Sequence, residues 1–265
     1  MTTEGPPLQW GSGRVTDRAR VVLAPNPSPM TLEGTNTWVL LEPGSTAAVV
    51  VDPGPLHEGH LTQVLEAVGN AGARVVLTLL THHHPDHAES ASRFAELTAS
   101  PVSALGIGAG GLSDGQRVSV GGLEILVVAT PGHTSDSLCF LLPAENALLT
   151  GDTVLGRGTT VVAWPDGELA AYLDSLDRIE SMTGAGEVAR FLPGHGPALP
   201  DAAAVVRHYR EHRAERLEQV RAAVAEGASE PRAVVERVYA DVPRELWPAA
   251  ELSVRAQLDY LVARD

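Results

Sequence analysis

The sequence of 265 residues contains no lysine and only one cysteine. This cysteine, Cys139, excludes an internal disulfide bond, and its apolar neighbours indicate a buried strand residue and not a nucleophile. A single cysteine is typical of a reducing compartment, so we expect a cytoplasmic protein. No apolar run is long enough to span a bilayer, and residues 1–14 lack the pattern of a signal peptide, so we expect no membrane partner.

Positive charge is also scarce. The 19 basic residues are all arginines and stand against 33 acidic residues, which gives a formal net charge of −14. Such a charge disfavours nonspecific binding to nucleic acid or membrane over the whole surface, and we expect no double-stranded DNA partner. Some of the carboxylates are expected to bind metal, so the net charge overstates the repulsion.

The stretch Thr81–His87, with the sequence THHHPDH, contains most of the metal-binding side chains of the chain. It follows the apolar run 75–80, which predicts a buried strand, and it precedes a helical pattern over residues 88–97. Internal position distinguishes it from a purification tag. An aspartate at this point can also simply cap the following helix.

The spacing within this stretch indicates how its side chains are arranged. Alternate side chains of an extended segment share a face, so His82 and His84 lie together and His83 turns away. Asp86 and His87 follow the turn and can point into the same space from another side. This geometry suits two metal ions better than one.

Three further side chains follow strand ends in glycine-containing turns: His133, Asp152 and His195. Each of them alone is more often a turn residue. Functional residues are commonly held on loops positioned by a rigid sheet, so together with the histidine cluster they predict a site. The preceding strands are expected at residues 121–129, 147–149 and 188–192.

Asp52 follows an expected strand over residues 47–51. It can be a simple turn former, which is the commoner role, or it can orient a metal-binding histidine. A helix is expected from about residue 60 to residue 70. We interpret His57 and His60 as surface residues.

The last 65 residues predict three helices. The first shows one periodic face, the second begins at Ser229-Glu230-Pro231 and ends near Ala240, and the third covers about residues 245–263. This tail carries 10 arginines against 12 acids, so a salt-bridged, solvated helix face is favoured over contact with RNA. The periodic face of the first helix contains Val206, Tyr209, Arg213, Leu217, Val220 and Val224.

The pattern H-x-H-x-D-H, followed by a distant His, Asp and His, resembles the metallo-β-lactamase-fold hydrolases. The resemblance covers roughly residues 15–200 and implies an α/β fold, a four-layer αβ/βα sandwich with the site at one edge of the sheets. The tail resembles a small C-terminal helical, winged-helix-like domain. We therefore predict a catalytic domain over residues 1–200 and a helical domain over residues 201–265.

The resemblance also implies the role of each site residue. One metal is held by three histidines, the second by an aspartate and two histidines, and a further aspartate bridges the two. Two Zn²⁺ ions per chain are expected, with Mn²⁺ or Fe²⁺ left open, and they share a hydroxide that attacks the substrate. Asp86 is the expected catalytic residue, and Asp52 supports the ligands. The expected ligands are His82, His84 and His133 for the first metal, Asp86, His87 and His195 for the second, and Asp152 as the bridge.

Departures from the family pattern narrow the expected substrate. Dizinc β-lactamases have a cysteine in the second metal site, diiron relatives have a glutamate where this chain has His84, and the long insert of the β-CASP nucleases is absent. Two groups of the family remain. One is the glyoxalase II-type thioesterases, and the other is the β-lactamase-like protein 2 group, whose members are endoribonucleases of single-stranded RNA.

The tail favours the β-lactamase-like protein 2 group, as do the stretches 26–37 and 238–243. The sequence therefore predicts a zinc-dependent hydrolase of phosphodiesters, acting as a nuclease on single-stranded RNA. A thioesterase or other hydrolase of small-molecule esters is the alternative, a β-lactamase is less favoured, and a metal-stabilised binding protein without turnover is the non-enzyme alternative.

Overall fold

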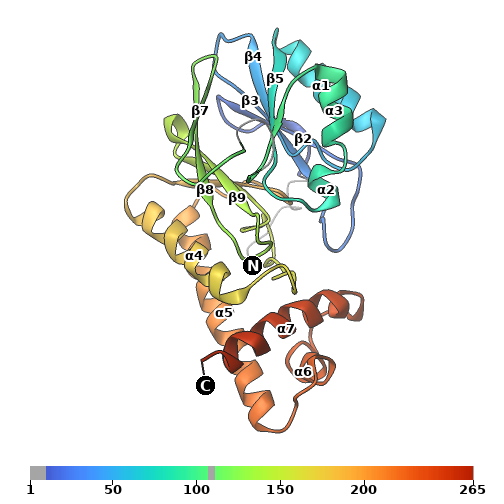
Figure 1. Cartoon of the computed structure of the whole chain (residues 1–265), viewed down its shortest axis with the longest axis vertical. Helices are drawn as coiled ribbons and strands as arrows, with labels where there is room; N and C mark the ends of the chain where they lie inside the picture. Colours follow the sequence, from blue (N-terminus) through green and yellow to red (C-terminus); the bar gives the residue numbers. More distant parts are fainter. Residues whose placement is uncertain (1–9, 107–110, 265) are drawn as a thin grey trace, which may run out of the picture.

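The computed structural model describes residues 10–106 and 111–264, and two β-sheets form its centre (Figure 1). The first sheet has six strands in the order β1-β2-β3-β4-β5-β6, and the second has five in the order β11-β10-β9-β8-β7. The pairs β4–β5, β5–β6 and β10–β11 are parallel, and the other pairs are antiparallel. The first sheet comprises Gly13–Arg14 (β1), Ala19–Leu23 (β2), Asn36–Leu41 (β3), Ala47–Val51 (β4), Arg74–Leu79 (β5) and Val102–Ser103 (β6). The second comprises Arg117–Val120 (β7), Leu123–Ala129 (β8), Leu138–Leu142 (β9), Ala147–Gly151 (β10) and Arg190–Pro193 (β11).

The facing sides of the two sheets share one hydrophobic core. Alternate residues of a strand point to the same face, and the core takes every second residue from the central strands. Trp38 and Leu40 of β3 enter it from the first sheet, and Ile125 and Val127 of β8 enter it from the second. These side chains are buried, so the two sheets pack directly against each other.

Helices cover the outer side of each sheet. Val39 and Val50 point outward from the first sheet and pack with α1 (Glu58–Asn70) and α3 (Ala91–Thr98). On the second sheet Cys139, which is fully buried in β9 as predicted, packs among residues of α4 (Leu169–Gly184) and α5 (Ala202–Ala225). The order of layers is helix, sheet, sheet, helix, which confirms the predicted sandwich. The short α2 (Pro85–Ala88) and the 3₁₀ turn η1 (Pro143–Glu145) complete this part.

The chain ends in a small group of helices, α6 (Pro231–Val238), the 3₁₀ turn η2 (Arg244–Leu246) and α7 (Trp247–Val262). Asp201 caps the N-terminus of α5 by accepting a hydrogen bond from the backbone N–H of Ala204, and Pro231 opens α6 as expected. The third helix begins two residues later than predicted, because η2 occupies its expected start. Within the described residues, no helix combines the length and apolar character that crossing a membrane requires.

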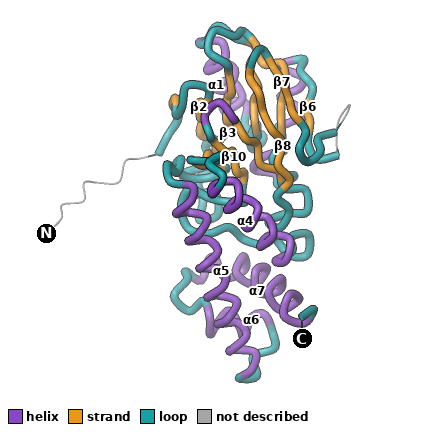
Figure 2. The backbone as a smooth tube through the Cα atoms, turned by 90° about the vertical axis from the view of Figure 1, so that its left-hand side faces the viewer, coloured by secondary structure: helices purple, strands orange, loops and turns teal. Residues whose placement is uncertain are grey.

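Helix α5 is common to both parts of the molecule (Figure 2). Val206 and Tyr209 in its first half pack with the second sheet and α4, whereas Val220 and Ala223 in its second half pack with α6 and α7. One helix therefore contributes to two cores, and the domain boundary after residue 200 stays a prediction.

Candidate metal centre

The seven predicted ligands and Asp52 lie in segments that follow the ends of five strands, with Asp86 and His87 in the short helix α2. Asp52 follows β4, the His82–His87 segment follows β5, and His133, Asp152 and His195 follow β8, β10 and β11. Strands that end at the same edge bring their following loops together, so residues from distant parts of the chain meet there. The structure brings all seven predicted ligands to this edge.

The first group of donors consists of three histidines. The Nε2 atom of His82 lies 3.1 Å from Nδ1 of His84, which in turn lies 3.0 Å from Nε2 of His133. Two ligands on one tetrahedral zinc ion, each about 2.0–2.1 Å from it, lie about 3.3 Å apart. The three nitrogens therefore have the separation that ligands of a single ion require.

The second group consists of Asp86, His87 and His195. The Nε2 atoms of the two histidines are 3.2 Å apart, and Oδ2 of Asp86 lies 3.1 Å from Nε2 of His195. The same carboxylate oxygen lies 3.4 Å from Nε2 of His87. One carboxylate and two imidazoles thus converge with the spacing of a second ion site.

Asp152 lies between the two groups. Its Oδ2 is 3.3 Å from Nε2 of His195 and 3.8 Å from Nε2 of His133, and its Oδ1 is 3.4 Å from Nε2 of His87. Oδ1 is buried and has no hydrogen-bond partner among residues 10–106 and 111–264. Buried carboxylate oxygens are normally satisfied, and a metal ion at this position would satisfy this one. The residues present therefore fit a metal centre.

A glycine keeps this space open. A Cβ atom added to Gly194 would lie 2.6 Å from Oδ1 of Asp152 and 2.7 Å from Cε1 of His87. Both distances are shorter than any normal contact of a Cβ atom, so a larger residue would push the ligands apart. The glycine of the Pro193-Gly194-His195 turn is therefore required by the site itself.

Hydrogen bonds made by Nδ1, the ring nitrogen that faces away from the centre, orient His133 and His195. Nδ1–H of His133 donates to the carbonyl of Val161 at 2.6 Å, and Nδ1–H of His195 donates to the carbonyl of Gly34 at 3.2 Å. A carbonyl can only accept, so Nδ1 carries the proton in both rings. Each Nε2 lone pair is consequently left facing the centre, as a metal ligand requires.

Asp52 has the corresponding role for His87. Its Oδ2 accepts hydrogen bonds from Nδ1–H of His87 at 2.9 Å and from the hydroxyl of Thr81 at 2.7 Å, and its Oδ1 accepts from the backbone N–H of Thr81 at 2.8 Å. The Thr81 hydroxyl lies 3.0 Å from Nδ1 of His82, from which it can accept a hydrogen bond. Asp52 is buried and has φ +53°, an uncommon value for a residue other than glycine. The structure thus places Asp52 behind His87 directly, and behind His82 through Thr81.

Burial keeps the first group of histidines neutral. It lowers the pKa of His82 well below its usual range and lowers the pKa of His84 to about 4. Burial also lowers the pKa of His133, against the opposing charge of Asp152. Only the neutral imidazole binds a metal, so these three side chains are in the ligand form near neutral pH.

In the second group the pKa values of the histidines are raised, in contrast to those of the first group. Burial opposes protonation of His195 and His87, but the carboxylate of Asp152 outweighs it, and the pKa of His195 rises to about 9. Burial likewise opposes ionisation of Asp152, but the neighbouring His195 and His87 lower its pKa well below the usual range. The metal-free group therefore holds protons on the imidazoles, and metal binding would release them.

Two histidines, His83 and His60, were not expected to bind metal, and the structure shows where each of them lies. His83 turns away from the centre as predicted, is exposed, and lies 2.9 Å from Oδ1 of Asp136. The prediction that His60 is a surface residue is wrong: its ring is fully buried, and its Nε2 lies 2.8 Å from the hydroxyl of Thr37 beneath the Asp52 turn. His60 shares the buried face of α1 with Leu61, Val64 and Val68, and this spacing is the signal that sequence reasoning missed.

Sequence reasoning also missed Asn36, which is fully buried at the start of β3. Its side-chain amide donates to the carbonyls of Pro193 and Gly196, at 2.9 and 2.8 Å. Nε1–H of Trp38 donates to the same Pro193 carbonyl at 3.0 Å. These bonds fix the loop that carries His195, and the sequence signal is a polar residue opening an otherwise apolar strand.

A pocket of 450 Å³ opens beside His133 and Asp152 and extends toward the C-terminal helices. Its walls come from the 29–32 loop, the 155–161 loop, α5 and the segment 239–253. Apolar side chains form much of the lining, among them Met30, Leu155, Val242 and Leu246. The metal centre is thus reached through a pocket that the last helices help to close.

Comparison with known proteins identifies the family. The family model for the metallo-beta-lactamase superfamily matches residues 30–103 and 109–195, and that for the beta-lactamase associated winged helix domain matches residues 231–265. A beta-lactamase domain protein from Burkholderia ambifaria has the same fold, with a TM-score of 0.81 at 23% identity over 99% of this chain and 91% of its own.

Three curated relatives are similar over most of this chain. The beta-lactamase-like protein 2 homolog of Drosophila melanogaster is 32% identical over 94% of this chain and 89% of its own. The atrochrysone carboxyl ACP thioesterase of Aspergillus chevalieri is 34% identical over 88% of this chain and 77% of its own. The lactamase-like protein adaB of Aspergillus niger is 34% identical over 80% of this chain, which spans 65% of that longer protein. The chain therefore belongs to the metallo-beta-lactamase superfamily of hydrolases, with histidines and aspartates positioned to bind metal ions and a winged-helix domain at its end.

Proposed function

We propose that the protein is a hydrolase with two zinc ions, held by the residues that the sequence predicted. The observation that carries this proposal is the position of Asp152 between two complete groups of three donors. In this proposal His82, His84 and His133 would hold one ion, Asp86, His87 and His195 would hold the other, and Asp152 would contribute to both. When bound, the ions would supply a hydroxide from water near neutral pH and polarise the bond under attack.

Asp86 is the side chain that we assign to orienting the attacking water. Its side chain is 28% exposed, so solvent reaches the carboxylate. Burial opposes ionisation of Asp86, but the neighbouring His195 and His87 outweigh burial and lower its pKa, so the carboxylate is ionised and can accept a hydrogen bond from the attacking water. Attack on an acyl carbon then breaks the C–S or C–O bond, and a carboxylic acid and a thiol or alcohol leave.

The pocket favours a small acyl ester or thioester as the substrate. A volume of 450 Å³ is the size of a small-molecule site, and its apolar walls suit an acyl group. The 34% identity to a thioesterase that acts on an acyl carrier protein supports this class.

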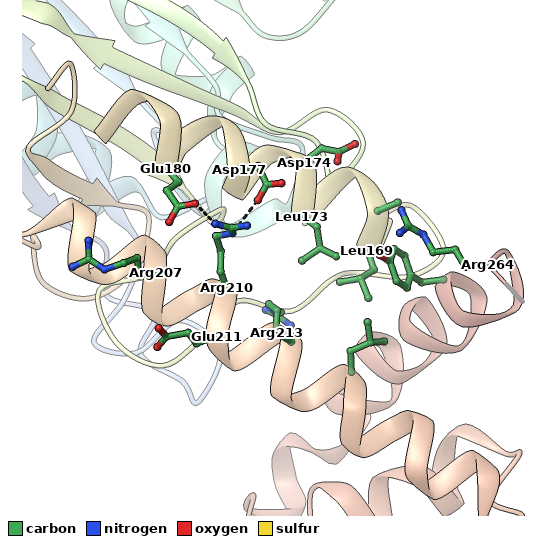
Figure 3. Close-up of a pocket in the computed structure, with 14 residues that line it drawn as sticks. Leu169, Leu173, Asp174, Asp177, Glu180, Arg207, Arg210, Glu211, Arg213 and Arg264 are labelled. Atoms are coloured by element: carbon green, nitrogen blue, oxygen red, sulfur yellow. Dashed lines mark hydrogen bonds and ion pairs between the residues drawn. The ribbon is translucent and has the colours of Figure 1, made fainter. Parts of the chain in front are cut away.

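Single-stranded RNA, the substrate that the sequence favoured, is the second candidate because of the winged-helix match at residues 231–265. Two of the five arginines of α5 are already paired with carboxylates of the protein, which weakens the case for RNA binding by this helix. Arg210 forms ion pairs with Asp177 and Glu180 (Figure 3), and Arg221 pairs with Glu218. Paired arginines offer little free positive charge to a phosphate backbone. Thioester hydrolysis therefore stands first.

Metal analysis tests the centre. Protein purified without chelators is expected to contain about two ions per chain. Asp152→Ala is expected to reduce both, whereas His195→Ala is expected to reduce the content to about one. A content near one in the wild type that His195→Ala leaves unchanged would refute the dinuclear proposal.

A substrate panel tests the reaction. Lactoylglutathione, single-stranded RNA, bis(p-nitrophenyl) phosphate and nitrocefin are compared at low salt, with Asp86→Ala as the control for contaminating enzymes. We expect turnover of the thioester that the variant lacks. Cleavage of RNA by the wild type alone would instead establish the nuclease, and a metal-loaded protein inactive on every substrate would favour the non-enzyme alternative.

A further inference from the structure

Two arginines of α5 border the pocket beside the metal centre without an acidic partner. Arg213 is only 6% exposed, and Arg216 is half-buried one turn further along the helix. Among the described residues, neither guanidinium forms an ion pair with a carboxylate, in contrast to Arg210 on the same helix. A buried charge without a partner is costly, and proteins keep such groups where they bind an opposite charge.

The contacts of Arg213 fix its guanidinium at the wall of this pocket, and the residue also lines the groove on the other side of α5. One nitrogen donates to the carbonyl of Thr160, which lines the pocket, and the guanidinium carbon lies 4.9 Å from the centre of the Tyr172 ring. Nε of Arg213 is buried and has no hydrogen-bond partner in the part of the chain that the structure describes. The hydroxyl of Thr160 lies 3.3 Å from Nδ1 of His133, so a single residue separates this positive charge from a proposed metal ligand.

Arg216 is fixed beside it. Its guanidinium carbon lies 4.3 Å from the centre of the Tyr239 ring, and one nitrogen donates to the carbonyl of Val238. Each guanidinium has five N–H donors, and within the described part of the chain one of them donates to a backbone carbonyl in each case. Stacking on an aromatic ring and one backbone contact therefore orient both groups and leave donors free.

His212 provides a third polar group at this wall. Its Nδ1 is buried, and none of the described residues forms a hydrogen bond with it. Burial, and then the charges of Arg213 and Arg216, lower the pKa of His212 to about 4. Its ring is therefore neutral near pH 7. Asp152 and the exposed Asp241 are the carboxylates that line this pocket, and neither neutralises the two arginines.

In the groove on the other side of α5, Arg210 shows the structural role that an arginine has when it is paired with carboxylates of the protein. This second pocket, of 640 Å³, is bordered by α4, α5 and α7, and there Arg210 is paired with Asp177 and Glu180 (Figure 3). Arg207 and Arg264 line the same groove and form no ion pair among the described residues. Arg213 borders both pockets, whereas Arg216 borders the pocket that leads to the metal centre and not this groove.

We infer that Arg213 and Arg216 form a subsite for an anionic group of the substrate, a carboxylate or a phosphate. The inference rests on the proposed hydrolase function and specifies its substrate: an ester or thioester whose apolar body spans from the metal centre to a negative charge at α5. Charge-assisted hydrogen bonds to a guanidinium discriminate strongly between an anion and a neutral group of the same shape.

Two thioesters of N-acetylcysteamine test the subsite in the metal-loaded enzyme, one with an ω-carboxyoctanoyl group and one with a neutral nonanoyl group. The wild type is expected to prefer the charged substrate in kcat/KM. Arg213→Met and Arg216→Met are each expected to reduce the ratio of the two kcat/KM values about 10-fold or more, as expected for loss of a charge-assisted hydrogen bond. Arg210→Met, on the same helix, is the matched control and leaves the ratio unchanged.

Binding provides a second measurement that does not depend on turnover. Calorimetry with octanoate, octyl phosphate and octanamide compares a carboxylate, a phosphate and a neutral ligand, with metal content checked in every variant. The anions are expected to bind more tightly than octanamide, and both arginine variants are expected to lose this advantage. Anions that bind the variants as tightly as the wild type are held by the metal, which overturns the subsite. No turnover of either thioester refutes the proposed function instead, whereas equal turnover of both refutes the subsite alone.

Discussion

Replacing Asp52 by asparagine tests a hydrogen bond that supports the metal centre without changing any proposed metal ligand. Asparagine tolerates the left-handed backbone at this position and has the same shape, so the turn is kept. The amide nitrogen cannot accept the hydrogen bond of 2.9 Å that His87 donates to Oδ2. Losing such a partner typically weakens metal binding about 10- to 100-fold, or about 1–3 kcal/mol. His87 is a proposed ligand of the second ion only, so we expect this ion to be lost first.

The assay is metal release into a graded series of chelator concentrations, with the metal that stays bound measured by elemental analysis. Wild-type protein is expected to release its ions at higher chelator concentration than Asp52→Asn, and the variant is expected to release one ion well before the other. Thr81→Val is the matched variant, because the lost hydroxyl faces His82 of the first group. Release curves identical to wild type in both variants would refute the view that these two side chains support the ligands.

Three further predictions follow from buried groups around the site. Burial, and less strongly His57, lowers the pKa of His60 to about 4, so the folded state resists protonation that the unfolded state accepts below about pH 6.5. The contribution of His60 to the free energy of unfolding is present at pH 7 and falls by about 2 kcal/mol at pH 5. Urea unfolding at both pH values is expected to show a smaller loss for His60→Gln than for the wild type. An equal loss in both proteins would contradict the burial of a neutral His60. Gly194→Ala places a Cβ 2.6 Å from Oδ1 of Asp152 and is expected to lower metal content and activity, whereas Gly69→Ala, with nothing within 4 Å, leaves both unchanged. Asn36→Ala leaves the Gly196 carbonyl without this donor, whereas the Pro193 carbonyl keeps the hydrogen bond from Trp38. The variant is expected to lower the free energy of unfolding by about 1–3 kcal/mol, measured by denaturant titration.

The residues of the centre could be predicted from the sequence because their chemistry and their local structure coincide. Imidazoles and carboxylates at strand ends, next to glycines, have few roles other than a metal site, and the structure places all seven predicted ligands together. Asp52 lies against His87, the geometry that a supporting residue requires. The sandwich fold was implied by the resemblance of the H-x-H-x-D-H pattern and the distant His, Asp and His to a known family, and the structure confirms it.

The environment of side chains that do not belong to a motif was harder to predict. The periodic pattern of α5 places Arg213 on its packed face, whereas its charge suggests solvent, and the sequence reading favoured a solvated, salt-bridged face for the helix. The structure shows ion pairs for Arg210 but buries Arg213 against Tyr172. His60 was misplaced for the same reason. Whether a polar side chain on a helix is buried depends on what packs over it, and that information lies in distant parts of the chain.

The length of α5 links the unfolding of the two ends of the molecule. Because its first half completes one core and its second half completes another, melting the final helices removes the support of the helix that covers the second sheet. The loop that bears Val161, which orients His133, is also tied to this region, since the N–H of Val162 donates to the hydroxyl of Ser253 in α7 at 3.2 Å. Thermal denaturation is consequently expected to be a single cooperative transition in which the pocket and the metal centre unfold together. The last helices therefore stabilise the end of the sheets that carries the metal centre.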